Sequence, residues 1–87
     1  MEYSEASLSA AHRHSSRHRA ELERSDRCGC FHCGAGFAFD AITEWIADEA
    51  GSALCPHCGI DAVLGSASGY PVGDPAFLAA MRRRWFG

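Results

Sequence analysis

Five cysteines are the residues of this 87-residue chain that are best suited to chemistry. Four of them form two C-x-x-C pairs in one shared pattern, CFHCG at 30–34 and CPHCG at 55–59. Two residues between the thiols let both sulfurs face one ion, while backbone N–H groups after each cysteine can donate hydrogen bonds to the thiolates. Glycine after the second cysteine suits the positive φ that closes such a turn. The pattern therefore predicts one metal ion, with zinc favoured over iron, and four ligands: Cys30, Cys33, Cys55 and Cys58.

The same cysteines allow two other chemistries. A C-x-x-C dithiol can do redox work, and the paired C-x-x-C-G turns also resemble rubredoxin, in which one iron shuttles electrons. Rubredoxin lacks a long helical segment at each end, however, and its aromatic pattern around the cysteines is not reproduced. Four thiolates on zinc would leave no open position for water or substrate. We therefore favour a structural site over an enzyme, and we assign no catalytic residue and no binding site for another cofactor.

Cys28 is left over by this assignment. It precedes Cys30 by two positions, so both side chains point to the same face of an extended segment. We interpret Cys28 as a small buried hydrophobic residue beside the site. The alternative is a reserve ligand, or a reactive thiol whose pKa is lowered by the neighbouring Arg27.

The histidines have two possible uses. On a helix, His14 and His18 would share one face and could hold a second metal or serve as acid and base. We interpret both, together with His12, as residues that dock or form hydrogen bonds. His32 and His57 occupy the third position of each cysteine turn, which normally points away from the ion, so we predict that they are not ligands.

The elements that would position the cysteines form a small metal-stabilised α+β domain of the zinc-ribbon, or rubredoxin-like, class. In a zinc ribbon, two cysteine turns called knuckles each supply one pair of ligands. Here the knuckles are separated by the 21 residues between Cys33 and Cys55. Strand-like segments flank the knuckles at 28–31, 36–39, 53–55 and 60–64. The predicted single domain has a disordered start, an N-terminal helix, the ribbon core and a C-terminal helix, at residues 1–9, 10–26, 27–65 and 74–86.

Two shorter patterns specify helices within and after the core. In the insert, Asp40 is a candidate N-cap and Gly51 a stop signal, which predicts a short helix from Asp40 to about Ala50. Its apolar face would be formed by Ile42, Trp45 and Ile46. Near the C-terminus, Asp74 and Pro75 form a cap followed by proline at the first helical position. The apolar stripe of this last helix would comprise Phe77, Leu78, Met81 and Trp85.

The formal net charge of -3 hides a segregated distribution. All eight basic residues are arginines near the two ends: Arg13, Arg17, Arg19, Arg24, Arg27, Arg82, Arg83 and Arg84. Between Cys28 and Phe77 the only charged side chains are acidic, so a phosphate-binding face must be built from the ends. We predict an unidentified protein as partner. Nucleic acid is the alternative, which requires the first helix to pack near the last one and pool its arginines with it.

The start of the chain lacks the basic and apolar segments of a signal peptide, and no stretch approaches the roughly 20 apolar residues of a membrane span. We therefore expect a cytoplasmic protein without a membrane partner. Thiols stay reduced in that compartment, where C-x-x-C pairs favour metal binding. The predicted function is that of a small zinc-binding, non-enzymatic module for protein interaction or regulation. The alternatives are a nucleic-acid-binding ribbon, or a redox protein or enzyme that uses Cys28 and the N-terminal histidines.

Six motifs carry a resemblance that covers about residues 12 to 87. They are HSSRHR (14–19), CGCFHC (28–33), ITEWI (42–46), ALCPHCGIDAVLG (53–65), SGYPV (68–72) and FLAAMRRRWF (77–86). With them the chain resembles a family of small, uncharacterised bacterial cytoplasmic proteins. The resemblance implies a self-standing protein with a zinc-ribbon-like core and supplies no reaction. Tyrosine is common in that family where this chain has His32 and His57, which implies again that they are not ligands.

Overall fold

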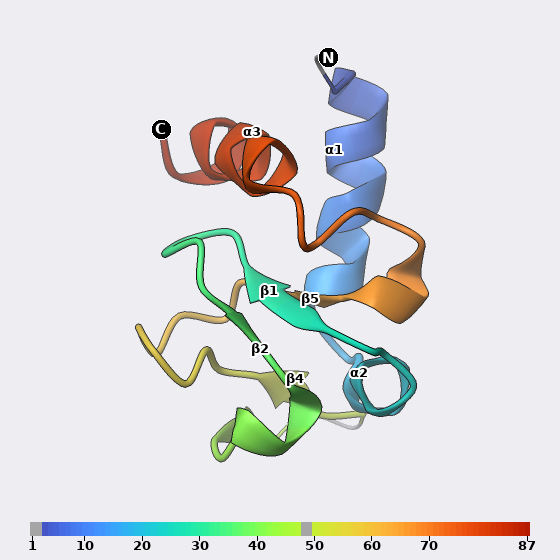
Figure 1. Ribbon diagram of the computed structural model, residues 1–87, viewed down its shortest axis with the longest axis vertical. Coiled ribbons are helices and arrows are strands. Elements are labelled where there is room, and N and C mark those ends of the chain that lie inside the picture. The colour runs from blue at the N-terminus through green and yellow to red at the C-terminus, as the bar shows by residue number, and fades with distance from the viewer. Residues whose placement is uncertain (1–2, 48–49) are drawn as a thin grey trace.

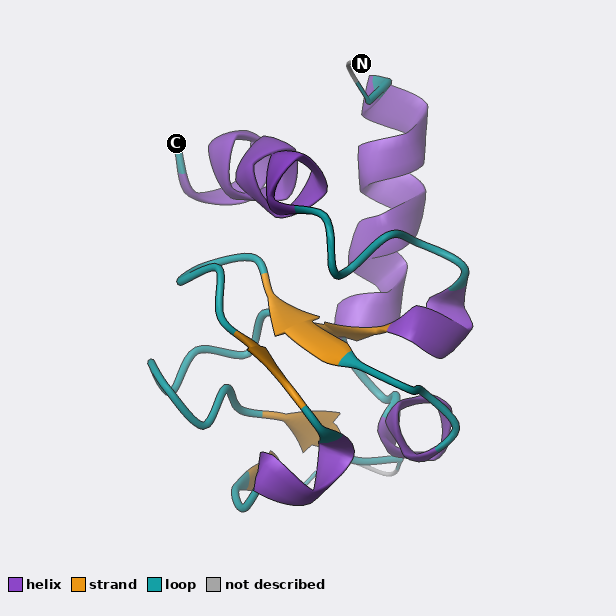
Figure 2. Cartoon of the chain, viewed as in Figure 1, coloured by secondary structure: helices purple, strands orange, loops and turns teal. Residues whose placement is uncertain are grey.

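The computed structural model of the protein describes residues 3–47 and 50–87. Helices α1 and α3 lie against each other at one end of the molecule, and the strands lie beneath them (Figures 1 and 2). In chain order the elements, with η for a 3-10 turn, are α1 (Glu5–His12), η1 (Arg13–Ser15), α2 (Arg19–Glu23), β1 (Cys28–Cys30), β2 (Gly36–Phe37), η2 (Phe39–Ala41), β3 (Trp45–Ile46), β4 (Ser52–Ala53), β5 (Val63–Gly65), η3 (Ser66–Ser68) and α3 (Pro75–Phe86). This is an α+β arrangement, as expected from the sequence.

Strand β1 is the centre of a three-stranded antiparallel sheet, in the order β2-β1-β5. Cys28 lies opposite Phe37 on one side and opposite Gly65 on the other. Because β5 follows the second knuckle (residues 55–59) and β1 precedes the first (residues 30–34), their pairing brings the two knuckles together. The second knuckle does not close a hairpin of its own flanks, since β4 pairs with β3 in a separate two-stranded sheet.

The prediction of a helix from Asp40 to about Ala50 is wrong for the described residues of this segment. The chain forms only the three-residue turn η2 and then strand β3, while residues 48–49 lie outside the described part. The sequence ITEWI is rich in β-branched and aromatic side chains, which fit a pleated surface better than a helix. Ile42 is buried as expected, but Ile46 is 41% exposed.

The single helix expected over residues 10–26 is also wrong, because the chain bends in its middle. Ser16 has an extended backbone, and Arg17 is the one non-glycine residue with positive φ (51°) among those described. The bend is held by hydrogen bonds to a distant segment. The Arg17 N–H donates to Ser52 Oγ (2.8 Å), and the His18 N–H donates to the Gly51 carbonyl (2.9 Å). These tertiary bonds outweigh the helical preference of the segment.

The expectation of disorder over residues 1–9 fails from Tyr3 onwards. Helix α1 begins after Ser4, whose hydroxyl accepts a hydrogen bond from the Ser7 N–H. Leu8 is buried, and the Tyr3 hydroxyl donates to Asp74 Oδ2 (3.0 Å) at the start of α3. A short helix is marginal alone in water, so this packing against α3 accounts for its order.

Helix α3 follows the sequence prediction closely. The Asp74 carboxylate caps it by accepting from the Ala76 N–H (2.9 Å), and Pro75 begins it. Phe77, Leu78 and Met81 are buried, whereas Arg82 and Arg83 are exposed. The largest fully buried side chains of the core are Phe31, Phe77, Leu22, Leu64, Met81, Val63, Cys28 and Cys30.

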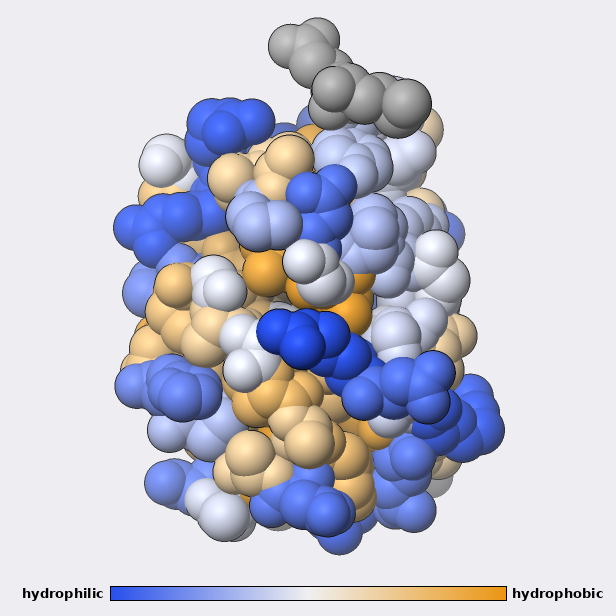
Figure 3. All heavy atoms as spheres, viewed as in Figure 1, coloured by the Kyte–Doolittle hydropathy of each residue, from blue (hydrophilic) through white to orange (hydrophobic). Residues whose placement is uncertain are grey.

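Hydrophobic and hydrophilic residues occupy different parts of the visible surface. In the view of Figure 3, hydrophobic residues run through the middle of the face, and hydrophilic residues gather at the lower right, over α2. Within the described residues, no helix has the length and apolar character needed to cross a membrane.

Candidate metal centre

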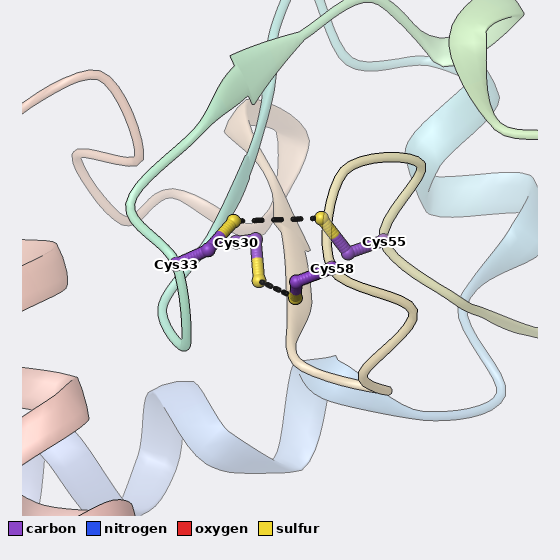
Figure 4. Close-up of side chains that lie close together, drawn as sticks. All are labelled: Cys30, Cys33, Cys55 and Cys58. Carbon is purple, nitrogen blue, oxygen red and sulfur yellow. Dashed lines mark hydrogen bonds between the residues drawn. The ribbon is translucent and has the colours of Figure 1, made fainter.

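The two knuckles bring four cysteine sulfurs together. The ligand atoms of Cys30, Cys33, Cys55 and Cys58, hereafter the four-cysteine cluster, all lie within 4.8 Å of one another. Figure 4 shows the sulfurs pairing across the gap between the knuckles, Cys30 with Cys58 and Cys33 with Cys55, each at 3.7 Å. Four sulfurs about 2.3 Å from one tetrahedral ion would be about 3.8 Å apart. The cluster could therefore hold a metal ion.

The backbone of each knuckle supports negative charge on its first sulfur. The His32 N–H donates to Cys30 Sγ (3.4 Å), and the His57 N–H donates to Cys55 Sγ (3.3 Å). Such bonds favour the thiolate form that a metal requires. The matching positions in the two CxHCG sequences thus make matching contacts.

Glycine closes both turns in the same way. The Gly34 N–H donates to the Cys30 carbonyl (2.8 Å), and the Gly59 N–H donates to the Cys55 carbonyl (2.9 Å). Their φ angles are 81° and 78°, in the left-handed region that favours glycine. The two CxHCG segments therefore form turns with the same closing hydrogen bond and the same glycine conformation.

The four thiols do not ionise independently. Burial raises the pKa of Cys30 well above its ordinary value, and the N–H groups of the first knuckle offset only part of this rise. Burial also raises the pKa of Cys55, but N–H groups of the second knuckle and the neighbouring thiols outweigh it, so the net change is downward. The surroundings of Cys55 therefore favour its thiolate form. Further negative charge at this partly buried place is best accommodated by a cation.

Both knuckle histidines lie outside the cluster. The imidazole of His32 packs edge-on against Phe86, with ring centroids 4.7 Å apart, and that of His57 lies 5.8 Å from the Phe37 ring. Among the described residues, the four cysteines are the group of three or more histidine, cysteine or acidic ligands that converges closely enough to hold an ion.

Cys28 also lies outside the cluster, although it shares β1 with Cys30. Its side chain is fully buried, and burial raises its pKa to about 11. The alternative of a thiol activated by Arg27 is therefore wrong, because the shift has the opposite sign. The guanidinium of Arg27 lies over Gly36 in the neighbouring strand.

The N-terminal histidines make separate contacts. His14 Nδ1 lies 3.0 Å from a carboxylate oxygen of Glu21, and the His12 ring packs against Trp85 at a tilt of 32°, with centroids 3.9 Å apart. His18 is buried, with Nδ1 at the His14 carbonyl (2.5 Å) and Nε2 accepting from the Ala53 N–H (3.0 Å). These contacts fit the docking interpretation.

His18 has a positioning role that sequence reasoning missed. Its ring and backbone join the bend after η1 to residues 51–53, which lead directly into the second knuckle. We call this connection the strap, formed by residues 16–18 and 51–53. Its only sequence signal is the spacing of His14, His18 and Leu22, which indicates a buried histidine but not its partner.

Comparisons with protein-family models, with curated proteins and with solved structures found no match to this chain.

Proposed function

We propose that this protein is a small zinc-binding module in which zinc stabilises a zinc-ribbon-like core. The observation that carries the proposal is the convergence of four thiols within 4.8 Å, with no other ligand type among the described residues joining them. Sulfur ligands select soft or borderline metals, and zinc is the common one in tetrahedral four-sulfur sites. The cluster would hold the ion, and zinc would supply a cross-link between the two knuckles.

A structural role follows from the number of donors. Four thiolates complete a tetrahedral shell, so a substrate or water would find no open position on the ion. We infer a non-enzymatic module that acts in the cytoplasm through contacts with another protein. Nucleic acid is the alternative partner.

Metal analysis of the purified protein tests this function. We expect about one zinc per chain in the wild type and in Cys28→Ser, whose thiol lies outside the cluster. Cys33→Ser and Cys58→Ser should lose most of the metal, because a serine hydroxyl replaces one thiolate donor. These two cysteines are the best choices because they are less buried than the other two, so the changes disturb the core least.

Several results would contradict the proposal. One iron per chain with a red colour would favour a rubredoxin-like electron carrier. Equal metal loss in Cys28→Ser and Cys33→Ser would mean that the cluster is not the site. A second zinc equivalent that disappears in a His14→Ala, His18→Ala variant would favour a catalytic centre instead.

A further inference from the structure

A second site lies away from the cysteines, around the bend between η1 and α2. A cavity of about 300 Å³ is lined there by side chains that include Arg13, Arg17 and Arg24. His14 and Glu21 line it as well. Three permanently charged residues thus line one small cavity in a chain whose net charge is -3.

The charge of this arginine cavity is largely uncompensated. Among the described residues that line it, the one acidic residue is Glu21, which is engaged by His14, whose Nδ1 lies 3.0 and 3.1 Å from the two carboxylate oxygens. Within residues 3–47 and 50–87, no acidic side chain forms an ion pair with the three arginines. The Arg24 guanidinium donates a hydrogen bond to the Ala20 carbonyl (3.3 Å).

Other arginines of the chain have evident structural partners. Arg84 pairs with Glu5 at 2.6 Å and joins α3 to α1. Arg19 pairs with Glu23 at 3.7 Å and covers the Trp45 ring at 4.6 Å. Within the described part of the chain, Arg13 and Arg17 have no comparable side-chain partner.

The strap fixes the backbone of Arg17, one of the residues that line the cavity. Its backbone has a φ of 51°, which non-glycine residues adopt rarely, and the hydrogen bond to Ser52 Oγ keeps it there. Backbone strain of this kind is concentrated at functional sites, where the surrounding structure maintains it.

We propose that the arginine cavity binds the phosphoryl group of a small molecule, either free phosphate or a phosphomonoester. Arginine is the residue that best matches phosphate, because its planar fork donates two parallel hydrogen bonds to the oxygens. A nucleic acid would need an extended basic face. Here three arginines line one cavity, and no basic residue occurs between Cys28 and Phe77.

Calorimetric titration of inorganic phosphate and of adenosine monophosphate into the metal-loaded protein tests the site. We expect saturable binding of one molecule per chain, with a dissociation constant on the order of 1 mM or below. Tighter binding of adenosine monophosphate would identify a phosphomonoester as the ligand class, and equal binding would identify phosphate itself.

Arg17→Gly is the most informative variant. Glycine adopts a φ of 51° freely, so the thermal midpoint should equal or exceed that of the wild type. Loss of the guanidinium should nevertheless weaken phosphate binding about tenfold or more. Weakened binding in a variant of undiminished stability cannot result from unfolding. Arg24→Gln should weaken binding similarly, and both variants should keep one metal per chain.

Arg83→Gln is the matched control. It removes the same charge from an exposed position on α3, in a different groove of the surface. Binding should change by less than about twofold. Equal weakening by Arg83→Gln and Arg17→Gly would reduce the effect to net charge and overturn the proposal. So would undetectable binding at about 10 mM phosphate, or tighter, steeply salt-dependent binding of single-stranded RNA to which Arg83 contributes equally.

Discussion

Cys28 and Cys30 stand two residues apart in β1, yet they meet different environments. Cys30 Sγ faces Cys58 Sγ at 3.7 Å, whereas Cys28 packs in the core. Burial raises the pKa of Cys28 to about 11, from an ordinary value of 9.0. A thiol that stays protonated near neutral pH is a poor nucleophile, and Cys28 is not among the four cysteines whose sulfurs converge. Burial therefore makes Cys28 a packing residue.

The metal-loaded protein should accordingly resist alkylation at Cys28. At a pH of about 8, well below the raised pKa, the thiol is protonated as well as inaccessible. Mass spectrometry after treatment with iodoacetamide should show Cys28 unmodified. The control is the same reaction with denaturant and chelator, which should modify all five cysteines. Rapid native modification of Cys28 would contradict its burial.

His18 connects two segments that are distant in sequence. Replacing it by phenylalanine keeps its bulk but leaves the Ala53 N–H and the His14 carbonyl without their partner. Each unsatisfied buried group costs about 1–3 kcal/mol, so we expect a loss of about 2–4 kcal/mol in urea unfolding of the metal-loaded protein. His57→Ala, at an exposed ring, should change stability by less than about 0.5 kcal/mol. If His18→Phe and His57→Ala lowered the unfolding free energy equally, the hydrogen bonds of His18 would contribute nothing specific to stability.

At the scale of elements, the knuckle is the repeated unit of the molecule. Both knuckles use a first cysteine whose carbonyl accepts from the closing glycine, and both support a sulfur with a histidine N–H. A Cβ on Gly34 or Gly59 would meet no atom within 4 Å, so glycine is required there for its φ rather than for space.

Substitutions at Gly34 test whether the turn needs glycine for its positive φ or for the space that a side chain would occupy. Gly34→Ala should lower the unfolding free energy by about 1–2 kcal/mol, because alanine is strained at a φ of 81°. Gly34→Asn adds a larger side chain but should cost less, since asparagine tolerates the left-handed region. Denaturant unfolding of both metal-loaded variants measures the order. A greater loss in Gly34→Asn would indicate that crowding, and not backbone conformation, limits the turn.

At the scale of the whole molecule, the sheet and the cluster depend on each other. Pairing of β1 with β5 aligns the knuckles, and the cluster joins them beyond the end of that pairing. Helices α1 and α3 contribute Leu8, Phe77 and Met81 to the same hydrophobic core that contains Cys30 and Cys55. A metal ion held by the cluster would cross-link the knuckles, and a small chain with two short sheets would gain much of its stability from that cross-link.

Removal of the metal with a chelator should therefore lower the melting temperature strongly. A ligand present at 1,000 times its dissociation constant stabilises a fold by about 4 kcal/mol. For a domain of this size that corresponds to about 15–30 °C. Circular dichroism melts with and without chelator, with zinc added back as control, provide the measurement. Acid should have the same effect as chelator, because protons compete with the metal for the thiolates. An unchanged melting temperature would exclude a structural metal.

Sequence reasoning anticipated local features whose causes are themselves local. The repeated CxHCG spacing predicted matching turns with glycine at positive φ, and Asp74 with Pro75 predicted the start of α3. It failed where tertiary contacts decide the outcome. Packing against α3 orders α1, the strap breaks the expected N-terminal helix, and pairing with β4 makes a strand of Trp45–Ile46.

By itself, the sequence determined which cysteines could act together, because two five-residue turns that share the pattern CxHCG place their thiols alike whatever surrounds them. Only the tertiary structure decided that the two turns meet, that Cys28 is withdrawn into the core, and that three arginines gather around one cavity. Those outcomes depend on contacts between residues tens of positions apart, such as the pairing of β1 with β5 and the bond from Arg17 to Ser52. No local pattern in the sequence records such contacts.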